Sequence, residues 1–182
     1  RITTPYNYDI IITNGEVIDG SGSSSVYKDV GIIGNKIHKI GNLSSAESER
    51  YIDAEGLVVS PGFIDVHVHL DPILRLSNSE SHVRQGVTTS LGGPDGTSPW
   101  PFGEFLDTLS QVGVGMNVAY LVGHNTVRRN VMGLENRAPS EEELNEMERQ
   151  ISAGMDEGAY GISTGLKYLP GSFSEVEEVI AL

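Results

Sequence analysis

The chain has 182 residues, enough for one ordinary domain or for a small domain with part of a larger one. Its 12 basic residues against 25 acidic residues give a formal net charge of −13, which argues against binding to nucleic acid or to an anionic membrane surface. The hydrophobic content of 38% is typical of a soluble globular protein, and no apolar run approaches the roughly 20 residues that span a bilayer. With no cysteine, disulfides and thiolate metal sites are excluded, so a metal would need histidine and carboxylate ligands.

The two ends of the chain indicate part of a longer protein. Arg1 stands where an initiator methionine would be expected, and no signal peptide is visible, so the compartment, cytoplasmic or periplasmic, stays open. Residues 174–182 begin with a capping serine and continue with helical spacing, without a terminating glycine, proline or basic residue. We therefore expect the sequence to stop inside a helix.

Residues 1–60 are predicted to form a small antiparallel β-sandwich segment. Short apolar runs alternate with turn residues throughout this part of the chain. Asn14-Gly15 separates the first two runs, and Gly34-Asn35 separates the next two. Both dipeptides are typical of β-hairpin turns, so each pair of runs is expected to form a hairpin.

Residues 61–182 are predicted to form a second, α/β domain. Strands and helices alternate in the expected order, with strands over 62–69, 86–91, 116–122 and 159–164, and helices over 78–85, 102–111 and 140–153. This alternation indicates a parallel sheet with crossover helices. Four such units fit the first half of a (β/α)8 TIM-like barrel, although a doubly wound sheet has the same rhythm.

The most informative segment is Asp65-Val66-His67-Val68-His69. Residues two apart on a strand share a face, so both imidazoles should project to the same side near the carboxyl end of the strand, with Asp65 one step below. Two neutral imidazoles there could bind zinc or a similar ion. A pair of structural histidines is the simpler alternative, but the carboxyl end of a barrel strand favours the metal.

Four ordered motifs carry a resemblance to a known family. Residues 61–69 (PGFIDVHVH), preceded by the β-rich segment, resemble the opening of the amidohydrolase superfamily. Three further motifs resemble one branch of this superfamily, the N-acyl-D-amino-acid deacylases (D-aminoacylases). They are QGVTT at 85–89, GHNTVR at 123–128 and GISTGLKYLPG at 161–171. The four motifs span nearly the whole chain and are together far more specific than any one of them.

The resemblance implies a metal-dependent barrel with Zn²⁺ or a similar divalent metal, as one or two ions. It makes His67 and His69 the metal ligands of the first strand. D-aminoacylases carry a metal-bridging cysteine after the Gly-Val-Thr-Thr motif, and counting from that motif brings Asp95 to its place. An oxygen ligand can also hold a divalent ion, so Asp95 is assigned as the third ligand; an ordinary Pro-Asp-Gly turn is the alternative.

The resemblance also implies roles around the metal. Tyr168 matches a family tyrosine that is placed to donate to the developing oxyanion, and its alternative is a packed aromatic under a Pro-Gly turn. His124 and Arg128, expected at the end of the third strand, would orient the site or bind a substrate carboxylate; a structural, hydrogen-bonded histidine is the alternative. Asp65 is assigned the same kind of role, in orienting the site or binding the substrate. Lys167 is interpreted as solvated, not as a metal-bridging lysine.

The activity that the resemblance implies is hydrolysis of the linear amide of N-acyl-D-amino acids to a carboxylate and a free D-amino acid. The partners would be this small-molecule substrate and the remainder of the barrel, which should supply later histidines and a general base beyond Leu182. A cyclic-amide hydrolase, such as a dihydroorotase or hydantoinase, is one alternative; it should prefer a lysine carbamate on the fourth strand, where Ser163-Thr164-Gly165 stands. A metal-free barrel acting as a binding or scaffold protein is another. The oligomeric state stays open.

Overall fold

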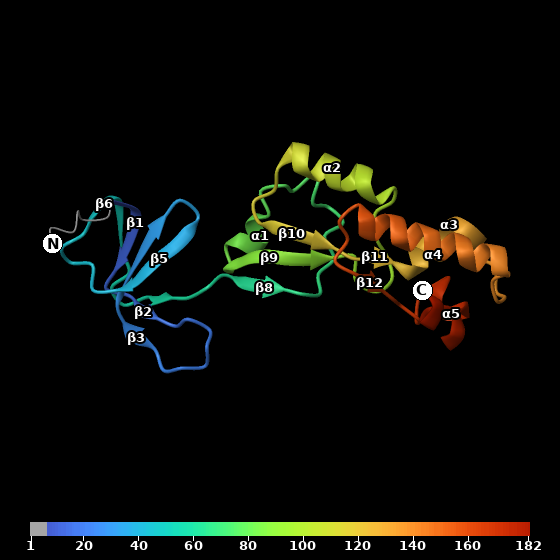
Figure 1. Cartoon of the computed structure of the whole chain (residues 1–182), viewed down its shortest axis with the longest axis horizontal. Helices are drawn as coiled ribbons and strands as arrows, with labels where there is room; N and C mark the ends of the chain where they lie inside the picture. Colours follow the sequence, from blue (N-terminus) through green and yellow to red (C-terminus); the bar gives the residue numbers. More distant parts are fainter. Residues whose placement is uncertain (1–6) are drawn as a thin grey trace. The chain divides into compact units, whose positions relative to one another are not determined.

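The computed structural model describes residues 7–182 as two units, the first ending at Pro61 and the second comprising Gly62–Leu182. The first unit contains only strands, and the second alternates strands with helices (Figure 1). The chain is therefore of the mixed α/β class. No helix within residues 7–182 combines the length and the apolar character needed to cross a membrane.

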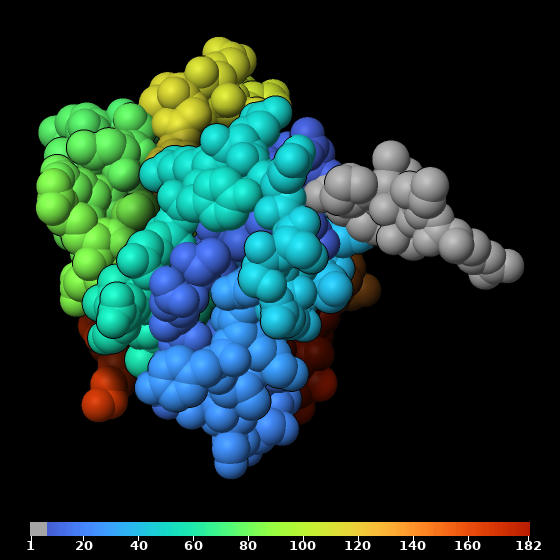
Figure 2. All heavy atoms as spheres, turned by 90° about the vertical axis from the view of Figure 1, so that its left-hand side faces the viewer, coloured from blue at the N-terminus to red at the C-terminus, as the bar shows by residue number. Residues whose placement is uncertain are grey.

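The first unit consists of two small sheets. One has the strand order β5-β4-β1-β6 and the other β3-β2-β7. Tyr8 and Ile11, of β1 in the larger sheet, are buried together with Leu43. Figure 2 draws the atoms of this unit as spheres, coloured from blue to cyan along the sequence. The strands are β1 (Asn7–Thr13), β2 (Glu16–Val17), β3 (Val26–Tyr27), β4 (Asp29–Ile33), β5 (Lys36–Gly41), β6 (Glu47–Asp53) and β7 (Val58–Val59).

The strand pairing corrects two expectations about this unit. It is not purely antiparallel, because β1 pairs in parallel with β6 and β2 pairs in parallel with β7. The hairpin predicted at Asn14-Gly15 is also wrong, since β1 and β2 belong to different sheets. A Cβ on Gly15 would lie 2.5 Å from Val59 Cγ2, so this glycine allows a close approach to β7. The hairpin at Gly34-Asn35, between β4 and β5, is confirmed.

The second unit is built around parallel strands. β8, β9 and β10 form a sheet in which both pairs are parallel, and β11 pairs in parallel with β12. The predicted parallel strands with crossover helices are thus confirmed. The strands are β8 (Phe63–Asp65), β9 (Val87–Gly92), β10 (Asn117–Tyr120), β11 (Val122–Gly123) and β12 (Ile162–Ser163); the helices are α1 (Glu80–Val83), α2 (Phe102–Val112), α3 (His124–Met132), α4 (Glu141–Asp156), the 3₁₀ helix η1 (Gly171–Phe173) and α5 (Val176–Ala181).

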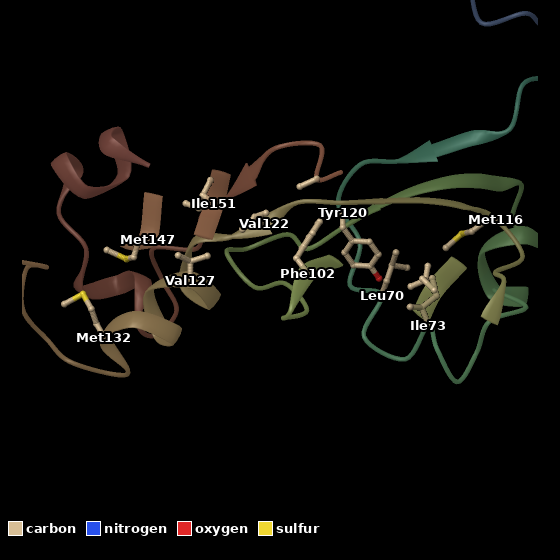
Figure 3. Close-up of a cluster of buried hydrophobic side chains, with 12 residues drawn as sticks. Leu70, Ile73, Phe102, Met116, Tyr120, Val122, Val127, Met132, Met147 and Ile151 are labelled. Carbon is tan, nitrogen blue, oxygen red and sulfur yellow. The ribbon is translucent and has the colours of Figure 1, made fainter. Parts of the chain in front are cut away.

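One continuous row of buried side chains joins these helices to the strands (Figure 3). Met147 and Ile151 of α4, four residues apart on one helix face, are buried near Val127 of α3 and Val122 of β11. Farther along the row, Phe102 of α2 lies near Tyr120 of β10, and the row ends at Leu70, Ile73 and Met116. Helices α2, α3 and α4 thus pack against β10 and β11.

Several elements differ from those predicted; the strand expected over 116–122 is split into β10 and β11, and the one expected over 159–164 is reduced to β12. The expected strand over 62–69 ends at Asp65, so His67 and His69 follow the strand and do not lie on it. The helix expected over 78–85 is reduced to the four residues of α1. Helix α3 was not predicted; it begins at His124, directly after β11 ends at Gly123.

Candidate metal centre

Three side chains with metal-ligand atoms meet beyond the carboxyl ends of β8 and β9. The Oδ2 atom of Asp95 lies 3.5 Å from His67 Nε2 and 3.3 Å from His69 Nε2. One ligand atom from each of the three residues lies within 4.8 Å of the others. The structure thus brings together the three residues that the sequence proposed as metal ligands.

These distances fit the spacing of atoms that share a divalent ion. Tetrahedral ligands at about 2.0–2.1 Å from zinc lie about 3.3–3.4 Å from one another. An imidazolium–carboxylate hydrogen bond would be shorter, at about 2.7–2.9 Å. Two imidazole nitrogens and one carboxylate oxygen are also a donor set that zinc accepts, with a fourth position left for water. The His67, His69 and Asp95 side chains are 64%, 60% and 32% exposed, so a small molecule can reach them.

Asp65 explains why the two imidazoles follow the strand. Its carboxylate accepts the backbone N–H of His67 at 3.1 Å, which is a local turn that competes with strand pairing. The two imidazole rings lie 6.2 Å apart between centroids, at an angle of 76°. The two histidines therefore lie after the end of β8 and not on the strand.

Asp95 is presented by a tight loop after β9. Its φ of 56° is left-handed, and the flanking Gly93 and Gly96 have φ values of 74° and 77°. A non-glycine residue adopts this conformation at a cost, so the surrounding structure must hold it. A Cβ on Gly165 would overlap the Asp95 carbonyl oxygen, which shows how closely the two backbones approach.

Tyr168 lies in the turn that follows Gly165 and is 55% exposed. Asn125 of α3 is buried and holds this turn, because its Nδ2 donates to the Gly165 carbonyl at 3.1 Å and to the Tyr168 carbonyl at 3.4 Å. The Tyr168 ring also lies beside Gly165, which itself contacts the Asp95 loop. The tyrosine is thus carried by a turn that packs against the loop of Asp95.

His124 and Arg128 belong to a separate, fully buried cluster. His124 Nε2 lies 2.8 Å from Glu178 Oε1, and Arg128 donates to Glu178 Oε2 at 2.5 Å and to the Arg137 carbonyl at 2.7 Å. Ser174 donates to the same Glu178 carboxylate at 3.0 Å. The carboxylate bound by Arg128 in this structure is therefore that of Glu178.

The sequence reasoning missed Glu178. It lies on α5 and is 4% exposed, although its neighbours Val176 and Glu177 are exposed. The spacing of Glu178 could have indicated its burial. Glu178 lies one helical turn before Leu182, and Leu182 packs against the core. An acidic residue on the apolar face of a helix usually has a buried cationic partner.

Two cavities open beside His69. One of about 280 Å³ has an apolar wall that includes Leu70, Ile73 and Met116, and the other, of about 300 Å³, is bordered by Pro94 and Tyr120. Burial raises the pKa of the Tyr120 hydroxyl, and the nearby Asp71 carboxylate raises it further, so this phenol stays neutral. The space next to the metal-ligand cluster is therefore lined by uncharged as well as charged groups.

Known proteins resemble the chain over nearly its whole length. D-aminoacylase of Alcaligenes xylosoxydans xylosoxydans is 36% identical over 197 residues, which cover 95% of this chain and 41% of that protein. The zinc and phosphonate complex of N-acyl-D-glutamate deacylase from Bordetella bronchiseptica superposes with a TM-score of 0.92 at 32% identity, over 97% of this chain and 42% of that one. A D-aminoacylase described as having a binuclear metal centre superposes with a TM-score of 0.91 at 34% identity, over 96% and 42% of the two chains.

The chain thus spans about two fifths of the length of these relatives. A dihydroorotase of Clostridioides difficile is 45% identical, but over only 89 residues, or 45% of this chain and 21% of that protein. The amidohydrolase family model matches residues 50–179. This match covers more than half of the chain, and the chain belongs to the amidohydrolase family.

Proposed function

We propose that this chain is the metal-binding part of a hydrolase that cleaves the linear amide bond of N-acyl-D-amino acids. The observation that carries the proposal is the convergence of His67, His69 and Asp95, at distances that suit a shared divalent ion. The similarity to D-aminoacylase and to N-acyl-D-glutamate deacylase over at least 95% of the chain supports the substrate class.

The finer architecture belongs to the same proposal. We infer that residues 61–182 form the first four units of a (β/α)8 barrel and that residues 1–60 contribute to a β-sandwich. The parallel order of β8, β9 and β10 and the parallel pair β11–β12 support the barrel. The remainder of the barrel would be the partner of this unit. Phe63 and Ile64 of β8 are 62% and 65% exposed, which leaves apolar surface for further strands to cover.

His67, His69 and Asp95 would hold the metal, zinc or a similar divalent ion. When bound, such an ion lowers the pKa of water and polarises an acyl carbonyl. Asp65 holds the His67 backbone and with it the direction of the imidazole. Asp95 supplies the negative charge that balances the cation and, in place of the family's cysteine, a harder oxygen ligand.

Tyr168 would act on the substrate itself. Its hydroxyl would donate a hydrogen bond to the carbonyl oxygen as that oxygen gains negative charge, without bringing a charge of its own. Its side chain is exposed and its turn is fixed by Asn125, which supports this role. His124 and Arg128 would orient the site through α3, since their buried bonds to Glu178 anchor the helix that carries Asn125.

Hydrolysis by the full-length protein tests the proposal. N-acetyl-D-amino acids and their L enantiomers are assayed as pairs, before and after removal of metal with a chelator. We expect turnover of the D substrates only, loss of turnover on chelation and recovery with zinc. Hydrolysis of dihydroorotate or hydantoins in place of the linear amides would favour the cyclic-amide alternative, for which Ser163 on β12 offers no lysine carbamate. Absence of metal and of all hydrolysis would favour the scaffold alternative.

A further inference from the structure

One hydroxyl group holds both sides of the loop that carries Asp95. Ser163, the last residue of β12, donates its Oγ–H to the Gly93 carbonyl at 2.5 Å and accepts the backbone N–H of Gly96 at 3.1 Å. These two backbone groups flank Pro94 and Asp95 in the chain. The hydroxyl therefore uses its donor and an acceptor lone pair to fix the ends of the loop.

The hydrogen bonds to Ser163 hold a loop whose backbone is in an unfavourable conformation at Asp95. Asp95 has a left-handed φ of 56°, a conformation that a non-glycine residue keeps only when its surroundings over-determine it. Gly165, two residues after Ser163, leaves no room for a side chain against the Asp95 carbonyl oxygen. The segment from β12 to Gly165 thus packs against the loop that carries Asp95.

We propose that Ser163 is a positioning residue that sets the distance of the Asp95 carboxylate from His67 and His69, and thereby the affinity of the site for its divalent ion. The proposal rests on the proposed function, because it assumes that these three residues hold the metal. Ser163 does not act on the ion itself; its hydroxyl bonds to the backbone on either side of the aspartate. Partners that orient metal ligands typically change metal affinity by about 10–100-fold when removed.

The test is a double-mutant cycle on zinc affinity, measured with the metal-stripped full-length protein against a chromophoric chelator. We expect Ser163→Ala to weaken zinc binding by about 10-fold. We expect the same change to have little further effect in an Asp95→Ala background, because the carboxylate that it positions is then missing. Thr164→Ala, at an exposed neighbour, is the matched control and should bind zinc like the wild type.

A pair of isosteric variants keeps the test decisive if Ser163→Ala does not fold. Ser163→Thr keeps the hydroxyl, and Ser163→Val introduces a side chain of the same shape as threonine but without the hydroxyl. We expect the threonine variant to bind zinc more tightly than the valine variant by about 10-fold. Far-ultraviolet circular dichroism of the metal-free proteins identifies the folded variants.

Two results would overturn the proposal: zinc affinity that is unchanged on removal of the hydroxyl, or an equal loss in the Asp95→Ala background. Failure of the proposed function looks different, because it concerns proteins in which Ser163 is intact. Wild-type protein that binds no zinc, or Asp95→Ala that binds zinc as the wild type does, would overturn the metal site and this inference with it.

Discussion

Asp95 gives the candidate metal centre its charge. Its carboxylate oxygen lies within 3.5 Å of two imidazole nitrogens, and its side chain is less exposed than either histidine. A carboxylate is a harder ligand than the thiolate that the resemblance places here, so the site should accept oxygen-preferring ions more readily than a cysteine-containing site. The identity of this one residue thus bears on the choice of metal.

His69 is the more direct test of metal dependence. Replacing His69 with asparagine removes one of the three ligand atoms, and we expect zinc affinity to fall by about 100-fold or more, with loss of D-substrate hydrolysis. Zinc content by elemental analysis and turnover are measured on the same sample. His38→Asn, on β5 of the first unit, is the control and should keep both. Unchanged hydrolysis by His69→Asn would contradict the metal-dependent account.

The sequence predicted the members of this cluster but not how they meet. The His-x-His pattern and the count to Asp95 identified the three residues, and their convergence agrees with that assignment. The geometry depends on Asp65, which captures the His67 N–H and ends the strand. A side-chain bond of this kind offers the backbone an alternative to strand pairing, and a strand pattern alone does not reveal it.

At the level of elements, the buried bonds of Glu178 tie α5 to α3. The Glu178→Gln substitution would leave the Arg128 guanidinium buried without its counter-charge, which typically costs about 3–5 kcal/mol of unfolding free energy. Urea unfolding of the full-length protein measures the change. Glu177→Gln, on the exposed side of the same helix, should alter stability little. Equal effects of the two substitutions would contradict the structural importance of the buried cluster.

Helix α4 should lose part of its stability in acid. Hydrogen bonds from Arg137 and from the Ser140 backbone lower the pKa of Glu143 from its ordinary 4.5 to about 2. A depressed carboxyl pKa stabilises the folded state above pH 4.5, and this contribution is lost as the pH falls toward 2. Thermal unfolding against pH should therefore show a gap between wild type and Glu143→Gln that narrows over this range. A gap that stays constant over this range would contradict the assignment.

The elements differ in how well the sequence predicted them, and the reasons are physical. Helix α4 was predicted because Ser140 and Glu143 form a capping box and the apolar residues follow a helical spacing. Helix α3 was missed because its buried face includes His124, Asn125 and Arg128, polar residues that resemble a loop until their partners are known. Those partners, above all Glu178, are about 50 residues away in the chain.

At the scale of the whole molecule, the chain provides the metal-ligand cluster and the tyrosine, and its relatives are more than twice as long. The proposed barrel would bring further strands to cover the exposed Phe63 and Ile64 of β8, and it would supply the general base. In this account substrate chirality is selected jointly by this unit and by the remainder of the barrel. The pairing of D and L substrates in the hydrolysis assay therefore reports on the assembled protein.

The most direct measurement is anomalous diffraction at the zinc absorption edge from crystals of the full-length protein grown with zinc. The account predicts a peak at about 2.0–2.2 Å from Nε2 of His67, Nε2 of His69 and a carboxylate oxygen of Asp95. A second peak nearby would indicate a binuclear centre. Catalytically active crystals with no peak among these three residues would contradict the account.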